Sequence, residues 1–348
     1  MSDKQKNQRW KVILTWVTLI ALIALAYTLR HQLAETFSNL GRVNALVLLL
    51  IIPIQLWNHH AQTKMYQTTF WLLGDRLRYR SMYRLSLEMN FVNNIFPSAS
   101  VSGFSYFGYR LKSGAGISGT KSTLVQLMKF ILMFVSFQIF LVFGVMLLAL
   151  DGQANGFIIL TASSLMTLLV VTTVGLAFVI GSKRRINGFF TTISRWLNKI
   201  IHKIRRNNPE TIKIDRVKEI FTDLHDNYMQ LRSKPRSMLK PLWYSLIANG
   251  TEIATVYVVY IAFGAWVNPG AIILAYAIAN FAGFVSVLPG GVGIYEGLMT
   301  IVLAAAGVPP AISLPVTVMY RVINMLIQLP PGGWLYYRSL HSKPLRHG

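Results

Sequence analysis

The sequence predicts an all-α, polytopic integral membrane protein, and three observations lead to this class. Of the 348 residues, 53% are hydrophobic and 13% are charged, whereas about 25% charged is typical of a soluble protein. Several apolar runs approach or exceed the roughly 20 residues that a helix needs to cross the hydrocarbon core. The basic residues gather between these runs. We therefore interpret residues 1–348 as a single membrane domain with seven to eight spans.

Hydropathy over a window of about 19 residues places the individual spans. They cover residues 12–29, 43–57, 122–150, 156–180, 241–263, 270–288 and 312–336. The first follows a basic tail, and its apolar run is long for a signal peptide, so we expect a retained helix. The apolar piece 298–307 is too short to cross a bilayer alone.

The distribution of Lys and Arg predicts how the chain is oriented. The N-terminal tail, the segment 64–84, the loop 182–240 and the C-terminal tail are basic, whereas the connections near 151–155 and 264–269 contain no Lys or Arg. The positive-inside rule places the basic segments in the cytoplasm. We therefore expect a bacterial or archaeal cytoplasmic (inner) membrane, cytoplasmic termini and an even number of crossings, with 298–307 as the candidate for the eighth.

The loop 182–240 contains two predicted amphipathic helices. In the first, apolar residues such as Phe189 and Trp196 recur at helical spacing beside basic residues. The second is expected to begin at Asn208, with Pro209 at the first helical position and an apolar stripe from 214 to 231. Such helices suit an anionic membrane surface. They could cap the cytoplasmic side or dock a partner.

Two apolar stretches are interrupted in a way that predicts broken or re-entrant helices. One reads "FVSVLPGGVGIYEG" and the other "NNIFPSASVSG". Proline removes a backbone donor and glycine frees the backbone, and polar backbone at membrane depth must meet protein or a wet cavity. The residues concerned are Pro97, Pro289, Gly290, Gly291 and Gly293. Two such segments in corresponding halves indicate a possible internal repeat around a transporter-type site.

Three blocks of sequence also carry a resemblance to a known family. They are "NNIFPSASVSGFSYFGYRL", "LPGGVGIYEGLMTIVLAAAGVP" and "VMYRVINMLIQLPPGGWLYYR". From about residue 10 to 338 the chain resembles the lysylphosphatidylglycerol synthase transmembrane, or flippase-like, family. The resemblance implies a domain that moves lipids between leaflets, without the soluble synthase domain of the bifunctional members. The first block departs from the family pattern, because no acidic residue precedes Arg110.

Two ionisable residues are expected inside membrane spans. Glu252 and Arg321 each lie well within an apolar run, where a charge costs about 2.5–3.5 kcal/mol on insertion scales. They could pair with each other and fix helix packing, or they could contact a headgroup. Asn249 precedes Glu252 by three residues and Asn324 follows Arg321 by three. Both could extend a polar network or join helices.

Three further charged residues lie near the interrupted segments. Glu296 would stand in the first turn of a short helix, where it could cap the dipole or coordinate a cationic headgroup. Arg110 could bind a lipid phosphate or simply lie at the interface. Lys129 could extend toward the cytoplasmic face.

Composition and motifs exclude several functions. There are no cysteines, and we find no Ser-His-Asp set, P-loop, metal-ligand spacing or cofactor motif, so we expect no enzyme and no cofactor. The formal net charge of +22 suits anionic lipids at the cytoplasmic face rather than nucleic acid.

Three functional hypotheses remain. The leading one is a lipid translocator. Its expected substrate-binding residues are Arg321, Glu252, Glu296, Arg110, Asn324 and Asn249. The alternatives are a non-catalytic membrane subunit that supports a lipid- or glycan-modifying enzyme, and an ion-coupled carrier of a small solute. A homo-oligomer or a membrane enzyme would be a possible partner.

Overall fold

The computed structural model describes residues 43–96, 99–204, 214–285 and 291–341, with isolated positions between 20 and 41. Every regular element in these ranges is helical, which confirms the predicted all-α membrane class. The helices are α2 (Ala45–Leu48), α3 (Ile51–Leu72), α4 (Tyr79–Ile95), α5 (Ala99–Ala115), α6 (Gly119–Leu150), α7 (Gly156–Ile180), α8 (Lys183–Ile204), α9 (Ile214–Arg232), η1 (Pro235–Met238), α10 (Leu239–Ala262), α11 (Pro269–Val285), α12 (Ile294–Ala305) and α13 (Pro310–His341). The described residues include four helices long and apolar enough to cross a membrane, at Gly119–Leu150, Gly156–Ile180, Pro235–Ala262 and Pro310–Leu340.

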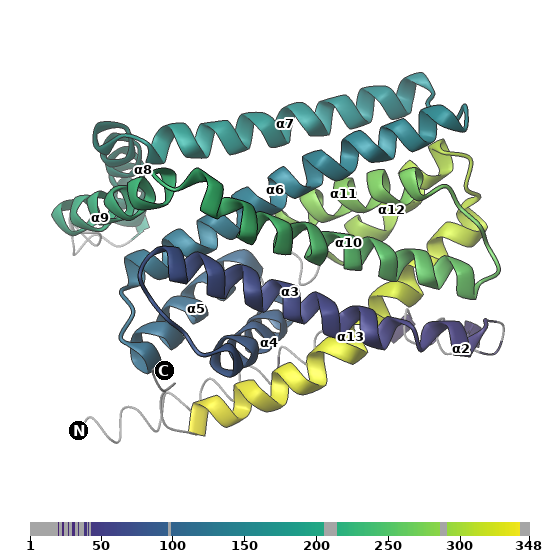
Figure 1. Cartoon of the computed structure of the whole chain (residues 1–348), viewed down its shortest axis with the longest axis horizontal. Helices are drawn as coiled ribbons and strands as arrows, with labels where there is room; N and C mark the ends of the chain where they lie inside the picture. Colours follow the sequence, from purple (N-terminus) through teal and green to yellow (C-terminus); the bar gives the residue numbers. More distant parts are fainter. Residues whose placement is uncertain are drawn as a thin grey trace.

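Helices α3 and α10 lie side by side and antiparallel (Figure 1). Asn44 N, before α3, donates to the Ala262 carbonyl at the end of α10 at 2.9 Å. Further along, Asn58 Nδ2 donates to the Ala248 carbonyl at 2.8 Å. The pair therefore defines two ends of the molecule. We call the end where α3 stops and α6 and α10 start the basic end, and the other the opposite end.

Helix α3 differs from the span predicted at 43–57. The structure instead begins the long helix at Ile51 and continues it to Leu72. Its buried face carries Gln55, Asn58 and Thr63, which lower its hydropathy. Since α10 supplies hydrogen-bond partners for Gln55 and Asn58, the helix can be polar and still lie within the bundle. The predicted span 12–29 lies largely outside the described residues.

Helices α11 and α12 form a hairpin that enters from the opposite end. Gly270, at the start of α11, packs against the Gly144 backbone of α6, and Asn155 Nδ2 before α7 donates to the Ala305 carbonyl at the end of α12 at 2.8 Å. Both outer ends of the hairpin therefore lie beside the connection from α6 to α7. The described parts of the segments 270–288 and 298–307 consequently belong to the two arms of one hairpin, α11 and α12.

Helices α4 and α5 form a second hairpin, which enters from the basic end. Gln67 Nε2 of α3 donates to the Leu77 carbonyl before α4 at 2.7 Å. Lys121 of α6 pairs with Asp75 at 2.9 Å. Helix α4 ends at Ile95 and α5 begins at Ala99, so the predicted interruption is present, although Pro97 itself lies outside the described residues.

The same order of elements occurs twice with opposite direction. A long helix, a hairpin and a second long helix follow one another as α3, α4–α5, α6 and again as α10, α11–α12, α13. Helix α6 packs on α11, and α13 packs on α4. The two hairpins enter from opposite ends (Figure 1), an arrangement that supports the predicted internal repeat.

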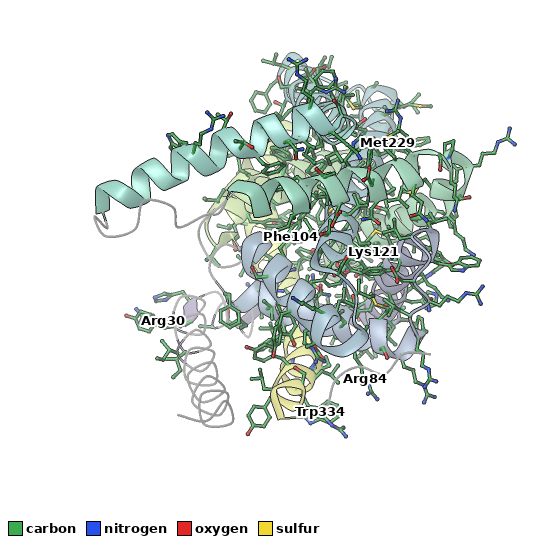
Figure 2. All side chains as sticks on the ribbon, turned by 90° about the vertical axis from the view of Figure 1, so that its left-hand side faces the viewer. Arg30, Arg84, Phe104, Lys121, Met229 and Trp334 are labelled. Carbon is green, nitrogen blue, oxygen red and sulfur yellow. The ribbon has the colours of Figure 1, made fainter. Side chains whose placement is uncertain are left out.

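Helices α8 and α9 are the two helices expected within the loop 182–240. They pack through the stacked rings of Phe190 and Phe221, whose centroids lie 3.5 Å apart. His225 Nδ1 lies 2.7 Å from the Ile180 carbonyl, which ties α9 to the end of α7. The expected start at Asn208 and Pro209 lies outside the described residues. Figure 2 views the basic end directly and shows nitrogen-tipped side chains, Arg84 among them, projecting from it.

Replacing Gly270 with alanine should destabilise the second hairpin. A Cβ at this position would lie well inside contact distance of the Gly144 carbonyl, and overpacking of this kind costs about 1–3 kcal/mol. We expect a lower melting temperature for Gly270→Ala in detergent. Gly175→Ala on α7 is the matched control, because nothing lies within 4 Å of its added carbon. An unchanged melting temperature for Gly270→Ala would contradict the close approach of α6 and α11.

Candidate functional site

A polar cavity of about 300 Å³ lies where the two hairpins meet. Helices α4, α5, α6, α11, α12 and α13 all contribute to its wall. The polar and charged lining residues are Asn90, Asn93, Asn94, Gln126, Lys129, Asn280, Tyr295, Tyr320, Arg321, Asn324 and Gln328. We refer to this space as the central cavity. Its position inside a bundle of apolar helices makes it the candidate functional site.

Arg321 on α13 forms a buried ion pair with Glu296 on α12. The two side chains are only 7% and 5% exposed. The guanidinium also lies 5.1 Å from the ring centroid of Tyr295, within the range of a cation–π interaction. The pair therefore joins the second hairpin to the last long helix at the wall of the cavity.

Glu296 is also the cap of α12, as the sequence indicated. Its Oε2 accepts a hydrogen bond from Gly293 N at 2.7 Å. Gly291 and Gly293 have φ values of 65° and 85°, a left-handed backbone that glycine adopts at little cost. The bend thus orients Glu296 toward both the helix start and Arg321. Pro289 and Gly290 lie outside the described residues.

Glu252 does not take Arg321 as its partner, which corrects the pairing expected from the sequence. Its Oε2 accepts hydrogen bonds from Tyr320 Oη at 2.9 Å and from Asn324 Nδ2 at 3.2 Å. Tyr320 and Asn324 are four residues apart and share a face of α13 that reaches α10. Arg321 is one residue further on, which turns it by about 100° toward α12.

The polar contacts around Glu252 continue beyond the residues that the sequence indicated. Gln328 Nε2 donates to Asn324 Oδ1 at 2.7 Å, and Gln55 Nε2 donates to Thr255 Oγ1 at 3.0 Å. Gln328 Nε2 lies 3.5 Å from Gln55 Oε1. Both glutamines are buried and lie in apolar runs of the sequence. An amide side chain in a membrane helix often bonds to a neighbouring helix, so these two residues could have been predicted from the sequence.

Asn249 lies apart from this network, which favours the second of its two expected roles, joining helices. Its Nδ2 lies 3.4 Å from the Met133 carbonyl of α6, a long hydrogen bond that joins α10 to α6. It does not line the central cavity. Asn249 therefore belongs to helix packing rather than to the site.

Arg110 also lies outside the central cavity. Its Nε and Nη2 contact the two oxygens of Glu88 at 2.9 and 3.3 Å, and the Tyr106 hydroxyl donates to the same carboxylate at 2.6 Å. The two paired side chains are 9% and 3% exposed. The acidic partner that the first block lacks locally is thus supplied by α4. No local sequence pattern indicated Glu88, because it lies on the preceding helix, 22 residues before Arg110.

Lys129 on α6 lines the central cavity instead of extending to the cytoplasmic face. Its Nζ lies 5.5 Å from the ring centroid of Tyr66. Within the described part of the chain it forms no ion pair. Lys129 is therefore a lining cation without an ion pair among the described residues, and the carboxylate of Glu252 is bonded to two other lining residues, Tyr320 and Asn324.

Two buried polar atoms of the lining add unused hydrogen-bonding capacity. Gln126 Nε2, a donor, and Asn93 Oδ1, an acceptor, have no hydrogen-bond partner among the described residues. Buried polar atoms are rarely left in this state without water or a ligand. The described residues include no group of three or more His, Cys, Asp or Glu side chains suited to a metal ion.

Comparison with known proteins identifies the family. The family model described as "Lysylphosphatidylglycerol synthase TM region" matches residues 12–332. The chain belongs to this family. The match includes both hairpins and the whole central cavity, and it confirms the resemblance noted in the sequence. Together with the membrane-spanning helices, it makes the chain an integral membrane protein of the lysylphosphatidylglycerol synthase transmembrane family.

Two archaeal relatives are similar over shorter lengths. A UPF0104 membrane protein of Pyrococcus horikoshii is 24% identical over 252 residues, which are 72% of this chain and 74% of the relative. A UPF0104 membrane protein of Methanothermobacter thermautotrophicus is 25% identical over 155 residues, 44% of this chain and 46% of the relative. The similarity to the first extends over most of both chains.

Removing one partner of the Glu88–Arg110 pair should lower the thermal stability of the protein, because the pair lies outside the central cavity and joins α4 to α5. Loss of one partner of a buried pair leaves an uncompensated charge and costs about 3–5 kcal/mol. We expect Arg110→Gln to lower the melting temperature sharply, and the double variant Glu88→Gln/Arg110→Gln to recover much of the loss. Thermal unfolding in detergent measures this. An Arg110→Gln protein that is as stable as the wild type would contradict a structural role.

Proposed function

We propose that the protein moves a phospholipid or a related lipid between the leaflets, with the headgroup in the central cavity. The observation that carries this proposal is a partly open polar cavity, lined by a lysine that has no ion pair among the described residues, between two hairpins that enter from opposite ends. The family name supports it, since it refers to the transmembrane region of a protein that synthesises a phospholipid.

The size of the central cavity argues for a headgroup rather than a whole lipid. At about 300 Å³ it is at the lower limit of ordinary small-molecule sites. The outer faces of α6 and α7 expose large apolar side chains, including Phe143 at 57% and Val171 at 62%. The acyl chains would therefore stay in the hydrocarbon beside such faces while the headgroup passes through the bundle.

The charges of the wall suggest separate roles in binding. Lys129 would attract the lipid phosphate, because it forms no ion pair with another described residue. Arg321 would exchange Glu296 for the phosphate through its planar guanidinium. Glu252 does not line the central cavity itself; it accepts hydrogen bonds from Tyr320 and Asn324, which do, and would hold these two side chains in position for the headgroup. Arg110 has no part in this path, because it is buried in its ion pair with Glu88 and does not line the central cavity.

We place the protein in a bacterial or archaeal inner membrane with the basic end in the cytoplasm. The basic end carries the arginines and lysines of the segment 64–84 and of α8 and α9, which the positive-inside rule assigns to that side. We expect no catalysed chemical step. A membrane enzyme or a second copy of the chain is a possible partner.

A leaflet assay tests the proposed function. The protein would be reconstituted in vesicles with fluorescent phosphatidylglycerol, and a membrane-impermeant reductant would bleach the outer leaflet. We expect the wild type to expose inner-leaflet lipid faster than protein-free vesicles. Lys129→Gln should slow this about tenfold or more, because hydrogen bonds to charged groups are worth about 1.5–3 kcal/mol.

Arg84→Gln is the matched control for charge. Arg84 is an exposed cation of the basic end that does not line the central cavity, so its variant should behave as the wild type. A wild type no faster than empty vesicles would refute the proposal. Equal rates for Lys129→Gln and the wild type would show that the central cavity is not the path.

A further inference from the structure

A second cavity, of about 430 Å³, lies at the basic end. We call it the basic-end pocket. Its wall has three parts: one face of α3, the start of α10, and the connection between α3 and α4. On α3, Lys64, Gln67 and Trp71 recur at intervals of three and four residues, so they share one face. None of the residues that line this pocket also lines the central cavity.

The basic-end pocket has a strong excess of positive charge. Lys64, Arg76 and Lys240 line it, and none of the three has an ion-pair partner within the described ranges. The one acidic lining residue, Asp75, is already paired with Lys121 at 2.9 Å. Three cations therefore converge on the pocket without a protein anion to balance them.

Local contacts hold these walls in place. Gln67 Nε2 donates to the Leu77 carbonyl at 2.7 Å, which fixes the connection against α3. Lys240 Nζ lies 5.7 Å from the ring centroid of Trp71. Lys64 Nζ lies 5.2 Å from that of Tyr79. Two of the cations are thus held beside aromatic rings rather than extended freely into solvent.

Tryptophans place the basic-end pocket at the depth of lipid headgroups. Trp71 in its wall and Trp243 on the neighbouring turn of α10 are 53% and 63% exposed. Exposed tryptophans at the ends of membrane helices lie at the boundary between hydrocarbon and water. An anion reaching the pocket from this boundary would carry acyl chains that lie along the bundle.

We propose that the basic-end pocket binds the phosphate of an anionic phospholipid from the leaflet at that end. Basic pockets between membrane helices are suited to such headgroups. The exposed tryptophans favour a lipid over free phosphate, because they offer apolar surface to the chains. This site is separate from the central cavity and does not depend on translocation, so the lipid would be a resident of the protein rather than its cargo.

Lipid titration with native mass spectrometry tests this site on the full-length protein in detergent. We expect the wild type to retain phosphatidylglycerol in preference to phosphatidylcholine. The variant Lys64→Gln/Arg76→Gln/Lys240→Gln should bind phosphatidylglycerol about tenfold or more weakly, because each lysine or arginine near an anionic headgroup adds to affinity. The matched control is Arg84→Gln/Lys112→Gln/Arg338→Gln, which removes three exposed cations that lie outside both the pocket and the basic loop and should bind as the wild type.

Each alternative result has a definite meaning. Equal binding by the pocket variant and the wild type, or equal loss in the control, would overturn the site. Displacement of phosphatidylglycerol by millimolar inorganic phosphate would overturn the assignment to a lipid. If the triple variant does not fold, Lys240→Gln alone serves, since Lys240 is exposed and its loss should still weaken binding. A leaflet assay that fails with unchanged lipid retention would reject translocation and leave this site standing.

Discussion

The balance of buried charge inside the helical bundle is the constraint on which the rest of the structure depends. An ionised side chain in hydrocarbon persists only with a partner or water. Glu296 and Arg321 tie α12 to α13, and Glu88 and Arg110 tie α4 to α5. Among the residues that the structure describes, a buried ion pair thus stabilises each hairpin. This pairing allows short helices, which cannot cross the membrane alone, to end inside the bundle.

The two ion pairs differ in their surroundings, and only one of them lies at the central cavity. The Glu88–Arg110 pair is enclosed and contributes nothing to the central cavity, whereas Arg321 lies in the cavity wall. In the same wall, Lys129 forms no ion pair with another described residue, and Gln126 and Asn93 keep unused polar atoms. A wall that is charged and incompletely satisfied is suited to bind a polar group and to release it again, as the proposed translocation requires.

Sequence alone could predict the membrane class, the two interrupted segments, the basic loop and several residues of the site. These features are local, because apolar length, proline, glycine and net charge are read within a few turns. Partner choice is not local. Arg321 faces Glu296 rather than Glu252 because one residue along α13 turns a side chain by about 100°. Glu88 could not be predicted as the partner of Arg110, because the two lie on different helices. The span predicted at 43–57 stops well before the end of α3, because the buried amide side chains of α3 lower its hydropathy.

Water access to the central cavity is the most direct test of the central claim. The chain has no cysteine, so single cysteines can be introduced without removing any native thiol. In reconstituted vesicles, Asn93→Cys and Asn280→Cys should react with a water-soluble maleimide, and phosphatidylglycerol should protect them. Val171→Cys, on the exposed apolar face of α7, should not react. Unreactive cysteines at both cavity positions, in protein that is otherwise folded, would contradict a polar path through the bundle.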